Sequence, residues 1–330
     1  MKYTRLGNSG LQVSRIALGC MSFGRPGTGR EWVLDADAAG AIFRTAIELG
    51  ITFWDTANTY SAGTSEEITG AAIGTYTRRD QIVLATKVWG RMGDGPGGRG
   101  LSRRAIFEQI DASLRRLGTD CIDLYQIHRF DPETPVEETM EALHDVVKAG
   151  KARYLGASSM WAWQFAKMQY TAQLHGWTPF ISMQSQYHLL QREEEREMFP
   201  LLGDQQVGSI PWSPLSGGFL TRPWGTERNT ARGAESQARR RDLYGTPTVL
   251  GTDKEIVDAV EHIARERDVS MAQVAMAWVL ANPVVAAPIV GATKTGHLTD
   301  AAAAVEVSLN ADEITALDQH YAIRQPTYYR

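Results

Sequence analysis

The chain has 330 residues, of which 43% are hydrophobic and 22% are charged, and its formal net charge is −4 at pH 7. This composition is typical of a soluble globular protein that can bury a sizeable core, and the charge gives no reason to expect a nucleic-acid or anionic-membrane partner. No apolar run approaches the ~18 residues of a membrane span and the first residues lack a signal-peptide core, so we expect a cytoplasmic protein.

The cysteines and histidines show no spacing that is typical of a disulfide framework or a metal site. Cys20 and Cys121 each lie in an apolar run, which fits a reducing compartment. None of the histidines forms an H-x-H or H-E-x-x-H pattern, so no metal ligand is predicted and a metal-dependent barrel hydrolase is disfavoured. The histidines are His128, His144, His175, His188, His262, His297 and His320.

The first residues predict a small β-hairpin. Residues 3–6 and 11–13 are short β-prone pieces on either side of the turn-forming sequence Gly-Asn-Ser-Gly. After it, short apolar runs alternate with segments in which apolar residues recur at helical spacing. The runs predicted to be strands are 16–19, 52–55, 82–87, 122–128, 154–159, 181–184, 207–211 and 284–290.

Helices are predicted between nearly all of these strands. Ser65 and Ser102 are candidate caps of two helices, Pro135 opens another that Gly150 ends, and Gly50 ends the first. The predicted helices are 37–49, one from 65, 102–117, 134–148, one from 161, 193–202, 253–267, 271–281, 295–305 and 311–321.

Eight apolar strands separated by helices are typical of a parallel sheet that helices cover on its outer face. Eight such units in about 300 residues predict an α/β fold, a single (β/α)8 TIM barrel with an N-terminal β-hairpin and extra helices near the C-terminus. No G-x-G-x-x-G sequence follows the first strand, so a doubly wound dinucleotide-binding sheet is disfavoured. Since no linker, repeat or low-complexity tract divides it, the chain 1–330 is interpreted as one domain.

A long polar insertion at 216–251 interrupts the alternation. It carries Arg239, Arg240 and Arg241, and such a charge run is usually a solvated face. A long loop at the active-site face of a barrel is also a place for a lid. The sequence leaves both interpretations open.

Polar side chains follow several predicted strands at the point where each strand ends. In a barrel these ends meet at the active-site face. Each residue has an ordinary interpretation, such as a helix cap, a lysine that reaches solvent, a core imidazole or a loop tyrosine. Together they predict a site, because several titratable groups reach one rim. These residues are Asp55, Tyr60, Lys87, His128, Ser158 and Gln184.

The groups could share one kind of chemistry, which is proton transfer to a carbonyl oxygen. A phenol has an ordinary pKa of about 10 and is a poor acid at neutral pH unless its anion is stabilised. A nearby ammonium can stabilise that anion, and a buried carboxylate can keep the ammonium charged and in place. An imidazole could orient the carbonyl oxygen.

Along essentially its whole length the chain resembles the aldo-keto reductases. The matching segments occur in the same order as in the family, and the ordered set is highly specific. The segments are RLGNSGLQVS (5–14), FWDTANTY (53–60), TK (86–87), DLYQIH (123–128), GASS (156–159), QSQY (184–187), PWSPL (211–215) and PIVGATK (288–294).

The resemblance implies an oxidoreductase that uses NADPH to reduce aldehyde or ketone carbonyls to alcohols. Tyr60 would be the general acid, Lys87 paired with Asp55 would lower the pKa of Tyr60, and His128 would orient the carbonyl. An alternative is an NADP(H)-binding regulatory protein that resembles the potassium-channel β-subunits. The presence of all four groups favours the enzyme. Its expected partner is a small-molecule carbonyl compound, and a homo-oligomer is left open.

The resemblance also implies that the cofactor is NADPH, with NADH less favoured, extended across the barrel mouth. Trp212 would stack on the nicotinamide where many members have a tyrosine, and Lys294 would bind the 2′-phosphate. His297 and Asp300 stand where glutamine and asparagine are common, and Asp300 adds a negative charge near the adenine. The predicted cofactor-binding residues are Met21, Asp55, Ser158, Ser159, Gln184, Trp212, Ser213, Leu215, Gly217, Gly291, Thr293, Lys294, His297 and Asp300.

The substrate pocket is predicted from large apolar residues near the rim. Trp32, Trp54 and Trp89, together with Met21, could wall a pocket around the carbonyl. Core packing accounts equally well for Trp54.

Overall fold

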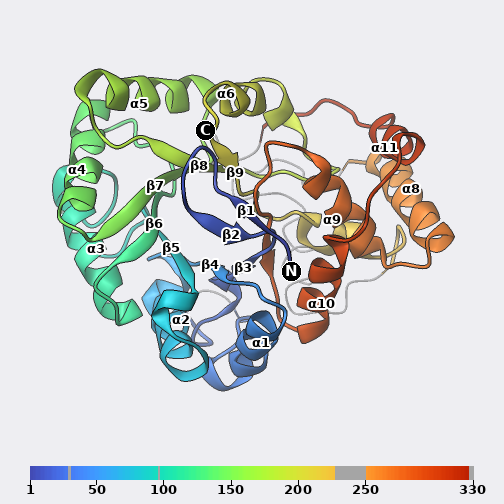
Figure 1. The fold of residues 1–330 in the computed structure, drawn as a ribbon, viewed down its shortest axis with the longest axis horizontal. Coiled ribbons are helices and arrows are strands. Elements are labelled where there is room, and N and C mark those ends of the chain that lie inside the picture. The colour runs from blue at the N-terminus through green and yellow to red at the C-terminus, as the bar shows by residue number, and fades with distance from the viewer. Residues whose placement is uncertain (29–30, 96, 227–249, 327–330) are drawn as a thin grey trace.

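A parallel sheet of eight strands forms the centre of the described part of the molecule, and helices surround it (Figure 1). The computed structural model describes residues 1–28, 31–95, 97–226 and 250–326. Neighbouring strands follow the order of the chain, except that the last strand lies beside the first. The strands are β3 (Ala17–Gly19), β4 (Phe53–Asp55), β5 (Val83–Val88), β6 (Ile122–Ile127), β7 (Ala152–Ser158), β8 (Phe180–Gln184), β9 (Gly208–Ser209) and β10 (Ile289–Gly291).

Parallel bridges next to β9 and β10 close the sheet into a barrel. Ser209 pairs with Val285, and Trp212 pairs with Ile289. The backbone N–H of Ala286 donates to the carbonyl oxygen of Ser209 at 2.8 Å. Each strand therefore has a parallel neighbour on both sides, and the predicted (β/α)8 barrel is confirmed.

Most of the helices lie around the outside of the barrel, and α8 (Asp253–Glu266) and α11 (Ala311–Asp318) lie further out, beyond α9 (Met271–Ala281) (Figure 1). In α3, the side chain of Ser102 accepts a hydrogen bond from the backbone N–H of Ala105 at 3.3 Å and so caps the helix as predicted. Ile106 and Ile110 bury its inner face, and left-handed Gly118 ends it. The helices are α1 (Ala36–Glu48), α2 (Thr64–Tyr76), α3 (Arg103–Leu117), α4 (Val136–Lys148), α5 (Ala162–His175), α6 (Met198–Asp204), α8 (Asp253–Glu266), α9 (Met271–Ala281), α10 (Thr295–Ala304) and α11 (Ala311–Asp318).

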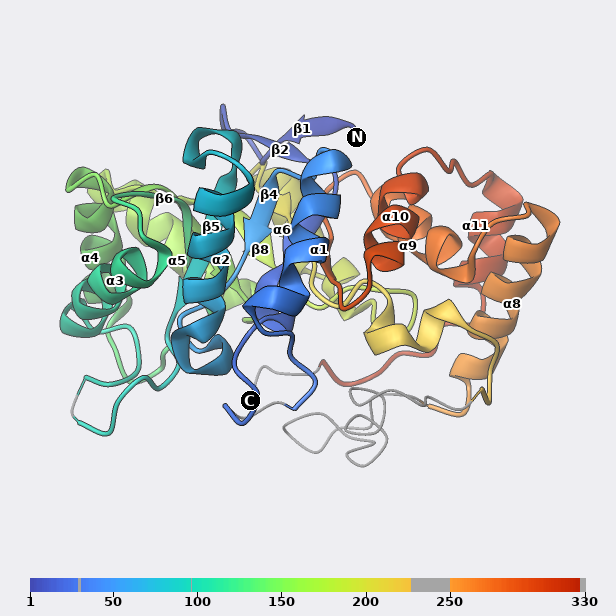
Figure 2. The same ribbon diagram turned by 90° about the horizontal axis from the view of Figure 1, so that it is seen from below.

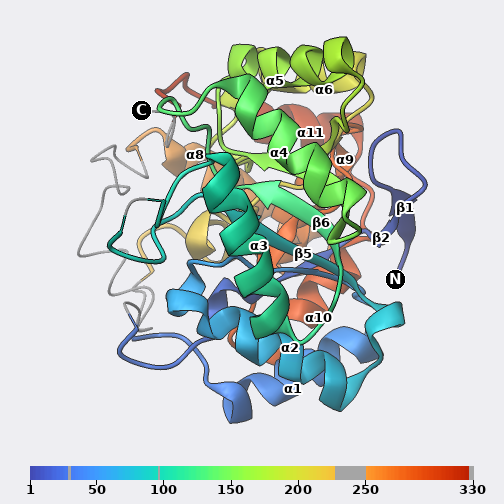
Figure 3. The same ribbon diagram turned by 90° about the vertical axis from the view of Figure 1, so that its left-hand side faces the viewer.

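The predicted hairpin is formed by β1 (Tyr3–Arg5) and β2 (Gln12–Ser14), and it covers one end of the barrel (Figures 2 and 3). Leu6 and Val13 are fully buried among the side chains that fill the barrel interior. Gly7 has a φ of +57°, and a Cβ there would lie 2.7 Å from a backbone oxygen of β8, so glycine is required. The hairpin contacts the beginnings of β8 and β9, which leaves the other end of the barrel for the loops that follow the strands.

The prediction that Ser65 caps α2 is wrong. The N-cap is Gly63, one residue before the first residue of the helix, and it provides no side-chain hydrogen bond. The hydroxyl of Ser65 lies within α2 and is buried, and it donates to the backbone carbonyl of Cys20 at 2.7 Å. Ser65 therefore ties α2 to the end of β3.

Two predicted elements are shorter than expected because a proline interrupts each of them. The predicted helix 193–202 is divided into a 3-10 turn, Glu193–Glu195, and α6. Pro200 lacks the N–H of a helix interior and fits only in the first turn, so the helix begins at Met198. The predicted strand 284–290 is reduced to β10, because Pro288 cannot donate to the ladder.

The predicted insertion at 216–251 is described only in part. It begins with a 3-10 helix, Ser216–Thr221. Residues 227–249, with Arg239, Arg240 and Arg241, lie outside the described residues, so both interpretations of the insertion stay predictions. Among the residues that are described, no helix is long and apolar enough to cross a membrane, and no group of His, Cys, Asp or Glu side chains could hold a metal ion.

Candidate active site

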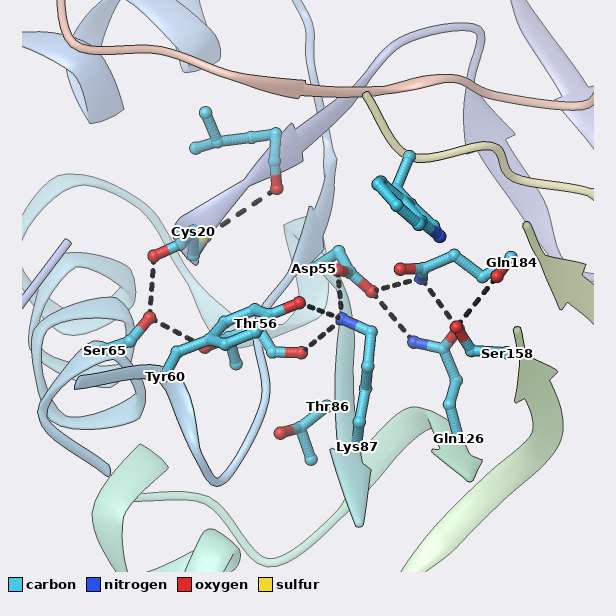
Figure 4. Close-up of polar contacts among 12 residues, drawn as sticks. Cys20, Asp55, Thr56, Tyr60, Ser65, Thr86, Lys87, Gln126, Ser158 and Gln184 are labelled. Atoms are coloured by element: carbon cyan, nitrogen blue, oxygen red, sulfur yellow. Dashed lines mark hydrogen bonds and ion pairs between the residues drawn. The ribbon is translucent and has the colours of Figure 1, made fainter. Parts of the chain in front are cut away.

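The ends of the neighbouring strands β4 to β8 bring polar side chains together. Asp55 is the last residue of β4, and the parallel register sets Lys87 opposite Gln126 and Ser158 opposite Gln184. Each of these five side chains has an exposed fraction of no more than 3%. Figure 4 shows the lysine and both glutamines converging on the carboxylate of Asp55. The site is therefore a buried polar cluster at the end of the barrel where the strands finish.

Lys87 makes three contacts through its amine, and all of them are with residues of β4 or the following loop. Nζ pairs with Oδ1 of Asp55, donates to the backbone carbonyl of Thr56 at 2.8 Å and donates to the hydroxyl of Tyr60 at 3.3 Å. Burial alone would lower the pKa of Lys87, but the charge of Asp55 and the hydrogen bonds to Asp55 and Tyr60 outweigh it, so this pKa is raised. The amine is therefore an ammonium at neutral pH.

Tyr60 begins a 3-10 turn, Tyr60–Gly63, on the loop after β4. The two residues that follow Tyr60 have φ angles of 48° and 53°, a left-handed conformation that is costly for side chains other than glycine. The turn places the phenol ring with its centroid 4.9 Å from Nζ of Lys87. The imidazole of His128 meets the same ring edge to face, with centroids 5.7 Å apart. The residues predicted to be catalytic therefore lie in one cluster.

Gln126 belongs to this cluster, although it is not among the site residues predicted from the sequence. Its Nε2 donates to Oδ2 of Asp55 at 2.8 Å, and Nε2 of Gln184 donates to the same oxygen at 3.1 Å. Both oxygens of Asp55 are thus used, one by an ammonium and one by two amides. The alternation of side chains along a strand could have predicted this position. Gln126 lies two residues before His128 on a predicted strand, so both side chains point to the same face.

The ends of β7 and β8 hold three of the predicted cofactor-binding residues. The hydroxyl of Ser158 donates to the backbone carbonyl of Gln184 at 2.8 Å, and the backbone N–H of Ser159 donates to the same oxygen at 3.1 Å. The indole N–H of Trp212 donates to the hydroxyl of Ser159 at 3.2 Å. These residues share Gln184 with the Asp55 cluster, so both sets form one site.

The loop after β9 contains several residues with a left-handed backbone conformation. Ser213, Ser216, Gly217 and Gly218 have φ angles of 54°, 51°, 60° and 92°, with Leu215 at −107° between the first two. The backbone N–H groups of Ser216 and Gly218 donate to the carbonyl oxygens of Ser213 and Leu215 at 2.8 and 2.9 Å, so tight turns hold the loop. Three of the predicted cofactor-binding residues, Ser213, Leu215 and Gly217, lie in this loop.

The remaining predicted cofactor residues lie in or just before α10. Lys294 is exposed at the N-cap position, where a helix favours an anion. The carboxylate of Asp300 accepts a hydrogen bond from Nε2 of Gln273 on α9 at 3.1 Å, which ties it to the neighbouring helix. The members of this set are Gly291, Thr293, Lys294, His297 and Asp300.

The assignment of Trp54 to the substrate pocket is wrong. Its ring is fully buried and packs against Phe43 of α1, with centroids 4.9 Å apart, and its indole N–H donates to the backbone carbonyl of Ile51 at 2.9 Å. Trp54 therefore belongs to the core between the barrel and its helices. Met21, Trp32 and Trp89 are half-buried outside the strands, and their assignment stays a prediction.

Glu194 is a buried carboxyl group in the segment that follows β8. Burial raises the pKa of Glu194 to about 8. The native protein then keeps a proton that the unfolded chain releases above the ordinary glutamate pKa, so this residue lowers the free energy of unfolding as the pH rises toward about 8. Glu194→Gln should therefore stabilise the protein at about pH 8 relative to about pH 5, measured by urea unfolding of variant and wild type. Exposed Glu197→Gln is the control and should follow the wild-type pH dependence.

Comparison with known proteins gives whole-length matches. The model of the Aldo/keto reductase family matches residues 15–322. Versiconal hemiacetal acetate reductase of Aspergillus parasiticus is 45% identical, and the match covers 97% of each protein. The aldo-keto reductase AFTS1 of Alternaria alternata is 41% identical over 97% of this chain and 91% of that protein. The aldo-keto reductase dtxS3 of Metarhizium robertsii is 42% identical over 97% of this chain and 90% of that protein.

Proposed function

Since the chain belongs to the aldo/keto reductase family, we propose that it reduces an aldehyde or ketone to the corresponding alcohol with NADPH. The observation that carries the proposal is the contact of the buried Lys87 ammonium with the phenol of Tyr60 at 3.3 Å, beside the carboxylate of Asp55. Relatives of the chain carry the names of reductases, which does not favour the alternative of a channel-type regulatory subunit.

The residues at the barrel mouth fit NADPH, which supplies a hydride to the carbonyl carbon when it is bound. Ser158, Ser159 and Gln184 offer hydroxyl and amide groups of the kind that a carboxamide pairs with. Trp212 offers an indole face beside them, and the pyrophosphate is assigned to the left-handed loop 213–218. Exposed Lys294 at the start of α10 suits the 2′-phosphate.

Tyr60 is proposed to give its hydroxyl proton to the carbonyl oxygen as the carbon receives the hydride. The phenolate that remains is stabilised by the ammonium of Lys87, which Asp55 keeps charged and in place. The imidazole of His128 lies beside the phenol ring and is assigned to orient the carbonyl oxygen. Tyr60 then regains its proton from solvent, and the alcohol carries one new C–H and one new O–H bond.

The test of the proposal is turnover. Purified protein mixed with NADPH and a panel of aldehydes and ketones should lose NADPH absorbance only when a substrate is present, and the alcohol should form. Tight NADPH binding with no turnover of the whole panel would favour the regulatory alternative. The proposed substrate is thus a small-molecule carbonyl compound. We also propose a cytoplasmic location, which cell fractionation can test, and a homo-oligomer, which light scattering can test.

The choice of NADPH over NADH predicts a selective effect at Lys294. Lys294→Gln should weaken NADPH binding about tenfold, because a charged hydrogen bond to the 2′-phosphate is lost. NADH binding should be unchanged, since NADH has no such phosphate. Both affinities can be measured by tryptophan fluorescence, with exposed Lys167→Gln on α5 as the control. An equal loss of affinity for both dinucleotides would contradict the assignment.

A further inference from the structure

We propose that Gln126 is a positioning residue that fixes which end of the Gln184 amide meets the cofactor, and that it thereby makes the site select for a carboxamide with an NH2 group. The inference rests on the proposed use of NADP(H). Gln126 itself is assigned no contact with substrate or cofactor. It acts through Gln184 and through the second oxygen of Asp55.

Gln126 is completely buried, and the neighbouring strand makes room for it. It pairs in register with Gly156 of β7. A Cβ on Gly156 would lie 3.0 Å from Cγ of Gln126, so any larger residue there would press on this side chain. The fold therefore holds the amide of Gln126 at one place between Asp55 and Gln184.

The hydrogen bonds define the orientation of both amides. The carboxylate of Asp55 can only accept, so each glutamine must present its NH2 group to Oδ2. Nε2 of Gln184 uses its second hydrogen on Oε1 of Gln126, at 3.0 Å. Both hydrogens of the Gln184 amide are thus used inside the protein, as the dashed lines in Figure 4 show.

The atom of the Gln184 amide that is left for a ligand is therefore Oε1, which is an acceptor. An acceptor at this position suits the NH2 group of a nicotinamide carboxamide and offers nothing to a methyl ketone of the same shape. Without Gln126, Nε2 of Gln184 loses one of its two acceptors and keeps only the bond to Oδ2 of Asp55, so the amide can rotate about that bond and move Oε1 away from the ligand. The selection for an NH2 group should then be lost while the dinucleotide still binds through its phosphates.

The test compares NADP+ with its 3-acetylpyridine analogue, in which a methyl group replaces the NH2 group. Binding of each is titrated by tryptophan fluorescence, so the readout is affinity and not turnover. The wild type should prefer NADP+ by about five- to tenfold, the size of one net hydrogen bond. Gln126→Met, which keeps the length of the side chain, should reduce that preference to about twofold or less.

Gln169→Met is a matched control, because Gln169 is also buried and also makes two hydrogen bonds through its amide. It donates to the backbone carbonyl of Phe180 at 3.1 Å and accepts from the N–H of Phe180 at 2.8 Å, at the opposite end of β8 from Gln184. This variant should lose stability to a similar extent and keep the wild-type preference for NADP+.

Gln126→Glu is the conservative variant that should show rescue. When the introduced carboxyl group carries a proton, it can donate to Asp55 and accept from Gln184, as the glutamine does. The charged and titratable groups around it are Asp55, Lys87, Tyr60 and His128. When the pH rises and the shared proton is lost, the two carboxylates repel each other. The preference for NADP+ should therefore be near wild type in mild acid and should fall with increasing pH.

An unchanged preference in Gln126→Met, or an equal loss in Gln169→Met, would overturn the role of Gln126. A wild type that binds neither dinucleotide would instead refute the proposed function on which this role rests.

Discussion

Replacing Tyr60 by phenylalanine should lower kcat for carbonyl reduction by about 10²–10⁴-fold, which is the usual contribution of a general acid. The change removes only the hydroxyl that Lys87 contacts at 3.3 Å. The ring that lies over the ammonium and beside His128 is kept. NADPH affinity should change by no more than a few-fold, because the phenol is assigned to proton transfer alone. Steady-state kinetics and a fluorescence titration measure the two quantities separately.

The control is Tyr170→Phe, since Tyr170 lies on α5 with 55% of its surface exposed, away from the barrel mouth. This variant should keep the wild-type kcat. If Tyr60→Phe lost reduction and NADPH binding together, Tyr60 would be a structural residue and the assignment of the acid would be wrong.

Replacing Lys87 by methionine should abolish reduction and also lower the free energy of unfolding by about 3–5 kcal/mol, which is typical when one partner of a buried ion pair is removed. The substitution leaves Asp55, which is 2% exposed, without its ammonium. The pKa of Lys87 is raised in the native protein. Its charge therefore contributes fully to the free energy of unfolding below the ordinary lysine pKa, and this contribution is lost only as the pH rises through the pKa of Lys87 in the native protein. Urea unfolding at neutral pH therefore measures it fully.

A double variant separates stability from catalysis at this pair. Asp55→Asn together with Lys87→Met removes both charges, so much of the lost stability should return while reduction stays absent. Lys254→Met is the surface control, because Lys254 pairs with Asp258 on the exposed side of α8 and should leave the unfolding midpoint almost unchanged. A Lys87→Met variant of wild-type stability would contradict the charged state assigned to the cluster.

Much of the barrel could be predicted because its signals are local. The strand that ends at Asp55 and the helix capped by Ser102 were both found from apolar spacing and a cap. Parallel strand ends meet at one edge, so finding the strands also brought Asp55, Lys87 and Gln184 together. The errors at Ser65 and before Pro288 arose where a tertiary contact or a missing N–H outweighed the local pattern.

The orientation of side chains could not be predicted in the same way. Trp54 is an apolar residue next to a site residue, and the sequence alone could not decide that it faces α1. Gln126 and Gln184 are 58 residues apart, and their pairing depends on β6 and β8 lying on either side of β7 in the sheet. Ser213 and Ser216 are left-handed although they are not glycines, so the sequence did not predict their backbone conformation.

Isotope labelling can follow the hydride from NADPH to the alcohol. Purified protein is supplied with NADPH that carries deuterium at both C4 positions of the nicotinamide, together with a ketone substrate from the panel, and the alcohol is analysed by mass spectrometry and NMR. We predict one deuterium atom on the carbinol carbon for each NADPH oxidised, and labelled alcohol that forms about 10²–10⁴-fold more slowly with Tyr60→Phe. Binding of NADPH without labelled alcohol would contradict the proposed reduction, and labelling at the wild-type rate with Tyr60→Phe would contradict the role of Tyr60 as the acid.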